Sequence, residues 1–201
     1  MTLNPARSAI PQEDRWNRES VFATSDEWRA SYDSLISRLG EADPYKGHLG
    51  DSPAVLADWL EFSAEFWRAV GKVFLYALME QAVDKTDQAA NAMADQAYGL
   101  LGRWQAAASF MNPELLQVGQ DNLNQWTQSE PRLQIYAHMV EDLFRQQAHV
   151  RSAEVEELLG LVGDPFNAAD NIADAMINAD LQFRPAVGSD GKEYPVTHGT
   201  E

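Results

Sequence analysis

The chain has 201 residues, and its 31 acidic against 15 basic side chains give a formal charge of −16, with no cysteine. Nucleic acid and anionic membranes are therefore excluded as expected partners, because phosphate binding needs clustered positive charge. The lack of cysteine excludes disulfides and thiolate chemistry, and an apolar content of 45% with six tryptophans argues against disorder. The N-terminus shows no apolar signal segment, so we expect a folded, cytoplasmic protein.

Three long amphipathic segments in the first half predict helices. The first covers about 25–39, where Thr24 stands at N-cap spacing before a glutamate. The second covers about 53–79 and follows Ser52, a good N-cap residue. The third covers about 88–111 and is rich in alanine, which permits close helix packing. These spacings predict a helical core built from aromatic and aliphatic stripes.

The segment 129–162 predicts two further helices joined by a tight corner, the second one opening at Ser152. Apolar residues recur at three- and four-residue spacing in both: Leu133, Tyr136, Val140, Leu143 and Phe144, then Val155, Leu158, Leu159 and Val162. Arg145 and His149 stand one helical turn apart, and Glu156 follows the corner. We interpret these three as a buried polar clasp that fixes the angle between the helices, in preference to a catalytic group, because no nucleophile or metal ligand accompanies them.

The last part of the chain predicts one more helix and then a hairpin. The helix starts near 164, with these apolar residues expected to point inward: Phe166, Ala169, Ala173, Met176 and Ile177. After it, alternating residues flank a turn at Gly188–Gly191, and Pro185 and Pro195 limit the hairpin to a short one.

The whole pattern predicts a mainly α protein. We expect an antiparallel array of about six or seven helices with a short C-terminal β-hairpin. The expected organisation is an irregular arm over 1–20, a helical lobe over 21–180, and a hairpin over 181–201.

The order of polar residues around the corner also carries a family resemblance. Residues 145–159 read R…H..S.E.E.LL, the loop at 45–49 reads YKGHL, and 113–115 reads PEL. This combination resembles the N-terminal domain of the oligoendopeptidase F family, the M3 zinc metallopeptidases of the thimet-oligopeptidase clan. Arg151 departs from the pattern, since the family usually has a leucine there.

The resemblance implies a wall of a deep peptide channel, completed in cis by a C-terminal catalytic domain that holds zinc. The full-length enzyme would hydrolyse oligopeptides. This chain has four histidines, and none stands in an HExxH motif. We therefore expect a fragment that has no catalytic residue, binds no catalytic zinc and is inactive alone.

Weaker sites and another function remain open. His138 and Asp142 lie one turn apart, but a hydrogen bond on the helix surface explains them better than a metal. Lys46, in the YKGHL loop, is a weak candidate for contacting peptide. The alternative function is a standalone acidic helical module that binds or regulates a protein partner. A covered C-terminal hairpin would favour that module, and exposed apolar residues there would favour a lobe that needs a second domain.

Overall fold

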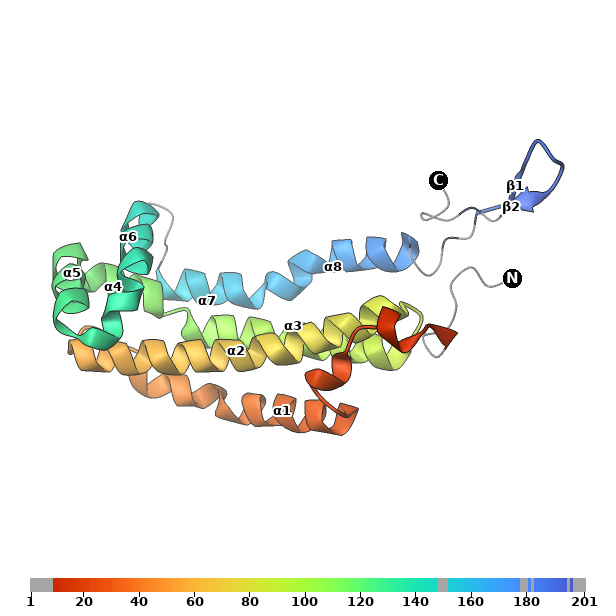
Figure 1. The fold of residues 1–201 in the computed structure, drawn as a ribbon. Helices are drawn as coiled ribbons and strands as arrows, with labels where there is room; N and C mark the ends of the chain where they lie inside the picture. Colours follow the sequence, from red (N-terminus) through yellow and green to blue (C-terminus); the bar gives the residue numbers. More distant parts are fainter. Residues whose placement is uncertain (1–8, 148–151, 178–180, 182, 195, 197–201) are drawn as a thin grey trace.

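The computed structural model describes residues 9–147, 152–177, 181, 183–194 and 196. Three long helices form its body: α1 (Ser25–Arg38), α2 (Pro53–Val83) and α3 (Gln88–Ala108). Consecutive helices run antiparallel, so α1 and α3 point the same way, and Figure 1 shows α3 lying between α2 and α7. The predicted mainly α class is confirmed.

A side-chain cap begins each of these helices, and the first two caps are the predicted ones. The hydroxyl of Thr24 accepts a hydrogen bond from the backbone N–H of Glu27 at 3.2 Å, and the hydroxyl of Ser52 accepts one from Val55 at 3.2 Å. The carboxylate of Asp87 accepts two bonds from the first turn of α3. Each cap satisfies N–H groups that have no partner inside the helix.

The middle of the chain turns across one end of the stack in short helices. These are α4 (Met111–Val118), α5 (Gln120–Ser129), the 3₁₀ helix η5 (Pro131–Tyr136) and α6 (Ala137–Arg145). Gly119 separates α4 from α5 with φ of +87°, a conformation that other residues rarely adopt. The third predicted helix ends earlier than expected, at Ala108, and the chain continues as separate short helices.

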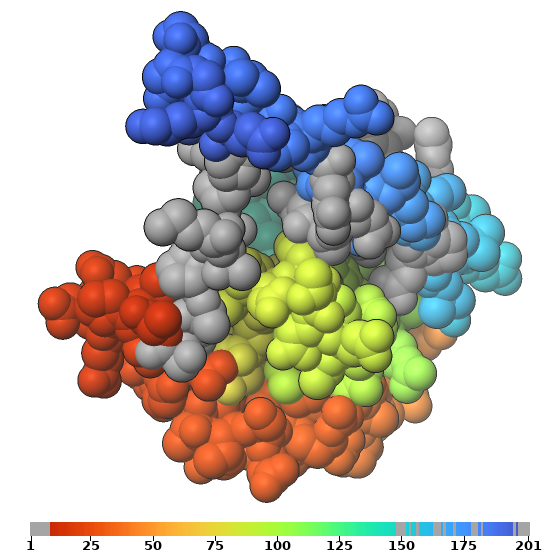
Figure 2. All heavy atoms as spheres, turned by 90° about the vertical axis from the view of Figure 1, so that its right-hand side faces the viewer, coloured from red at the N-terminus to blue at the C-terminus, as the bar shows by residue number. Residues whose placement is uncertain are grey.

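The chain then returns along α3. Helices α7 (Ala153–Leu161) and α8 (Gly163–Ala175) both contact α3, and Figure 1 shows them running back toward the end where α1 begins. Beyond α8, strands β1 (Ala186–Val187) and β2 (Glu193–Tyr194) pair antiparallel, which confirms the hairpin. Figure 2 shows this hairpin, in dark blue, projecting beyond the helices.

Short 3₁₀ helices complete the described structure. Two lie before α1, η2 (Gln12–Asp14) and η3 (Arg18–Ser20), and η4 (Leu39–Tyr45) continues directly from α1. None of the helices in the described part of the chain combines the length and apolarity that a bilayer crossing requires.

An aromatic cluster forms the centre of the core. Phe66 stacks on Trp104 at 4.3 Å between ring centroids, and Trp59 meets Phe110 at 4.7 Å. Near one end of α1, the buried indole of Trp28 donates a hydrogen bond to the backbone oxygen of Val73 at 2.8 Å. Aromatic contacts of this kind contribute free energy beyond area burial. The core continues into α5, η5 and α6, where Leu123, Leu133 and Val140 are buried.

Candidate functional site

The C-terminal part of the chain presents many apolar side chains to solvent. We call the following set the C-terminal apolar face: Val155, Leu158, Leu159, Leu161, Phe166, Ile172, Met176, Ile177, Leu181, Phe183, Val187, Tyr194 and Val196. Phe166 is 73% exposed and Leu158 is 58% exposed. The expectation that the apolar residues of α8 point inward is therefore wrong within this chain, because α8 touches α3 at few positions and nothing else in the described chain covers it.

A close contact through glycine holds α7 against α3. A Cβ placed on Gly160 would lie 3.2 Å from the backbone nitrogen of Ala106 and 3.4 Å from its Cα. Helix α8 is attached by the Lys85–Asp174 ion pair, whose nitrogen and oxygen lie 2.6 Å apart. These contacts use the backbone and polar groups, so the leucine side chains of α7 are left at the surface.

Exposed apolar groups in this number are unusual for a monomeric soluble protein. The largest apolar patches of such proteins are commonly binding surfaces. The remainder of the described chain, by contrast, exposes few large apolar residues: Trp16, Trp67, Leu75, Val83 and Ile135. The C-terminal apolar face is thus the principal candidate for a surface that another protein region covers.

The loop that contains Lys46 is fixed by a carboxylate from α4. Glu114 accepts hydrogen bonds from the backbone N–H of Gly47 at 2.6 Å and of Leu49 at 3.2 Å. Gly47 has φ of +86°, and Leu49 is fully buried. Lys46 is exposed on this turn. The YKGHL and PEL segments quoted above therefore meet in one structural unit.

A groove of about 360 Å³ lies beside this turn. Gly47, Glu114, Asn122 and Trp126 are among the residues that line it. Lys46 stands next to the groove in the chain, so its predicted role in contacting peptide stays a prediction.

The proposed clasp is only partly within the described structure. Arg145 pairs with Asp142 on its own helix, and this pairing holds the pKa of Asp142 below its ordinary value. His149 lies outside the described residues, as does the side chain of Glu156. Contact among Arg145, His149 and Glu156 therefore stays a prediction.

The described histidines lie on the surface and do not build a metal site. His48 pairs with Asp51 at 2.8 Å, and His138 lies 3.9 Å from Glu141, not against Asp142. Among the described residues, no three His, Asp or Glu side chains gather closely enough to hold a metal ion. The described residues thus do not fit a zinc ion, which the family resemblance places in the C-terminal domain.

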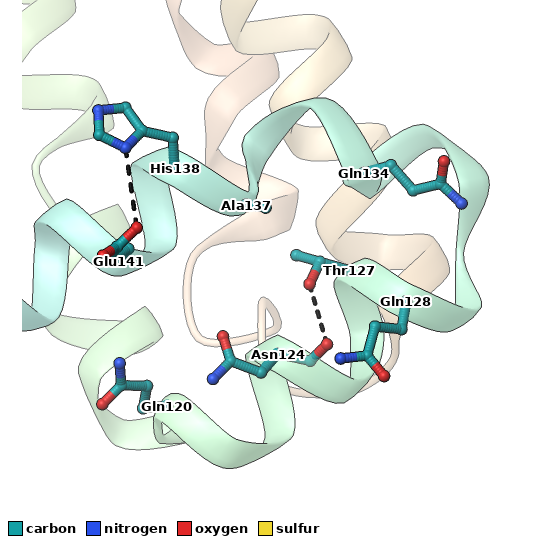
Figure 3. A pocket seen from close by; sticks show the side chains of 8 residues that line it. All are labelled: Gln120, Asn124, Thr127, Gln128, Gln134, Ala137, His138 and Glu141. Carbon is teal, nitrogen blue, oxygen red and sulfur yellow. Dashed lines mark hydrogen bonds and ion pairs between the residues drawn. The ribbon is translucent and has the colours of Figure 1, made fainter.

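One polar groove was not predicted from the sequence. It has a volume of about 820 Å³ and lies between α5 and the η5–α6 segment, as Figure 3 shows. Its lining contains four carboxamides: Gln120, Asn124, Gln128 and Gln134. The first three stand at every fourth residue of the sequence, and this spacing could have indicated a row on one side of a helix. It could not be used because α5 was not predicted to be a helix.

Comparison with known proteins gives consistent results. The profile of the family described as Oligopeptidase F matches residues 114–183. The group B oligopeptidase PepB of Streptococcus agalactiae is 32% identical over 98% of this chain and 33% of its own length. The oligopeptidase PepF of Bacillus subtilis is 27% identical over 97% of this chain and 29% of its own.

The fold agrees with these sequence matches. The crystal structure of oligoendopeptidase-F from Enterococcus faecium superposes with a TM-score of 0.79 at 28% identity, and the match covers 88% of this chain and 35% of that one. The helical architecture is thus one found in bacterial peptidases. The chain belongs to the oligoendopeptidase F family and corresponds to the N-terminal domain of its members, which confirms the resemblance. It spans about a third of the length of the curated relatives it matches.

Proposed function

We propose that this chain is the non-catalytic N-terminal lobe of an oligoendopeptidase F-like metallopeptidase, and that it forms one wall of the substrate channel. In this proposal the full-length enzyme hydrolyses short peptides, and the zinc is held by a C-terminal domain joined in cis. The chain alone cleaves no peptide. The matches to oligopeptidases over about a third of their length support the proposal.

The exposure of the C-terminal apolar face is the main observation in support of this proposal. Burial of apolar area stabilises an interface by about 25 cal/mol per Å². Leu158 and Phe166 are more than half exposed in this chain, so a second domain that covered them would gain that free energy. The face also leads into the hairpin, where Phe183 and Val187 are exposed. Their exposure favours a lobe that needs a second domain over the self-contained module.

A chimera tests the proposal. The chain replaces the matching region of the Enterococcus faecium relative, and hydrolysis of a fluorogenic oligopeptide is measured. We expect the chimera to be soluble and active, and the 201-residue chain alone to be inactive. A catalytic remainder that is equally active without this chain would contradict the proposed role, as would hydrolysis by the chain alone.

Matched variants show whether the face is the interface. Leu158→Ser combined with Phe166→Ser places two hydroxyls in the proposed contact, so the chimera should lose activity and solubility. Trp67→Ser combined with Leu75→Ser changes two exposed apolar residues on α2 and should leave activity unchanged. Equal effects of the two pairs would argue against the C-terminal apolar face.

A further inference from the structure

The groove between α5 and the η5–α6 segment contains a regular row of carboxamides. Gln120, Asn124 and Gln128 lie one helical turn apart along α5. Figure 3 shows Gln120 and Asn124 reaching into the space between α5 and α6. The opposite wall carries His138 and Glu141. The lining is thus mostly uncharged, in a chain whose formal charge is −16.

These carboxamides are available for a ligand. Within the described part of the chain, the side-chain amides of Gln120, Asn124 and Gln128 make no hydrogen bond to another residue. The Thr127 hydroxyl beside them donates to the backbone oxygen of Asn124 at 2.9 Å, so that contact uses the backbone and leaves the amide group free. Each carboxamide offers both donors and an acceptor.

The spacing of the row matches an extended peptide. Residues four apart on an α-helix rise by about 6.0 Å, and two residues of an extended strand span about 6.6 to 6.8 Å. Main-chain N–H and C=O groups that face one side of a strand repeat at every second residue. A carboxamide at every helical turn can therefore meet successive N–H and C=O groups of one peptide edge.

Other occupants fit the groove less well. A helical partner would need a row of large apolar side chains to dock on, whereas Ala137 is the one lining residue here without a polar group in its side chain. Nucleic acid would need basic residues, whereas the groove carries Glu141 and no lysine or arginine. The volume of about 820 Å³ is within the usual range for a small ligand, which a short peptide segment fits.

We propose that the α5–α6 groove binds the main chain of an extended peptide segment through the carboxamides of Gln120, Asn124 and Gln128. The choice of a peptide as ligand rests on the function proposed above. Because these contacts read the backbone and not side chains, binding tolerates varied sequences. The groove thus gives the channel wall a sequence-independent subsite.

Nuclear magnetic resonance of the 201-residue chain tests this directly. The probe is a short peptide of alternating alanine and serine, blocked at both ends so that it carries no charge. We expect the side-chain NH₂ signals of Gln120, Asn124 and Gln128 to shift on titration, and those of Asn122 and Gln125 on the same helix to stay in place. A peptide N-methylated at alternate residues, which lacks those N–H donors, should cause no shift.

Variants supply the matched control. Asn124→Leu removes one of the carboxamides that bond to the peptide main chain and should weaken binding by about three- to tenfold. Gln125→Leu changes an exposed amide outside the groove and should leave the affinity unchanged. Unshifted groove amides, or equal shifts with the N-methylated peptide, would overturn the proposal. Shifts with maltohexaose and none with the peptide would overturn it in favour of a carbohydrate.

The outcomes separate this proposal from the proposed function. The titration needs no catalytic domain, so peptide-induced shifts beside an inactive chimera contradict the lobe function alone. Unshifted amides beside an active chimera contradict the groove alone.

Discussion

The carboxylate of Glu114 accepts a hydrogen bond from the backbone N–H of Gly47 at 2.6 Å, across 67 residues of sequence. The other oxygen of the same carboxylate accepts a bond from Leu49 at 3.2 Å. One side chain at the start of α4 therefore holds the turn that carries Lys46. The positive end of the α4 dipole favours the charge at this position.

Glu114→Ala should lower the free energy of unfolding by about 1 to 3 kcal/mol, because two backbone donors lose a charged acceptor. Urea denaturation measures the change. Gln117→Ala, an exposed site on the same helix, should alter stability far less. Equal stability of the Glu114 variant and the wild type would show that water replaces the carboxylate without cost.

The helices with dense apolar stripes were predictable from the sequence. Leu133, Val140 and Leu143 are buried at the expected spacing, and the caps of α1 and α2 lie at the expected residues. Helix α5 was not predicted because Leu123 is its single buried residue among those described. One apolar residue gives no period, so only tertiary packing reveals this helix.

The sequence also did not predict which part of the protein covers the apolar sides of α7 and α8. The pattern of α7 and α8 indicates an amphipathic helix pair correctly, but periodicity does not say what covers the apolar side. Leu158 and Leu159 follow the predicted stripe and are nevertheless exposed. The Glu114 contact with Gly47 was likewise unpredictable, because it depends on where two distant turns meet.

Gly160→Ala should loosen the contact between α7 and α3. The new methyl group would lie 3.2 Å from the backbone nitrogen of Ala106, which cannot rotate away as a side chain could. We expect the free energy of unfolding to fall by about 1 kcal/mol or more, since overpacking exceeds the gain in helix propensity. Faster hydrogen exchange of the α7 amides would locate the effect.

Gly71→Ala is the matched control, because nothing lies within 4 Å of the added Cβ on α2. It should raise the free energy of unfolding by about 0.5 to 1 kcal/mol through helix propensity alone. If both glycine variants changed the free energy of unfolding in the same direction, the close α3–α7 contact would be contradicted.

The turn between α2 and α3 should show a pH-dependent contribution to stability. The Thr86 hydroxyl donates to the carboxylate of Asp84 at 2.6 Å and its backbone N–H donates at 2.9 Å, and these bonds hold the pKa of Asp84 below its ordinary value. A lowered carboxyl pKa stabilises the fold above the unfolded-state pKa of about 3.9. That stabilisation is lost as the pH falls through the lowered pKa.

Thr86→Val removes the hydroxyl donor and keeps the backbone N–H. The pKa of Asp84, followed by carbon NMR of its carboxyl group, should rise toward the ordinary value. The stability difference from the wild type should be present near neutral pH and vanish in acid. Thr127→Val, on α5, should leave the titration of Asp84 unchanged, and an unchanged titration in Thr86→Val would refute the assigned cause.

The most direct test of whether a second domain covers the C-terminal apolar face is hydroxyl-radical footprinting. It is applied to the isolated chain and to the chimera with the Enterococcus faecium catalytic region. The account predicts strong labelling of Leu158, Phe166 and Ile172 in the isolated chain and protection of all three in the chimera, with Trp67 labelled equally in both. Equal labelling of those three residues in the two proteins would contradict it, because no second domain would then be covering the face.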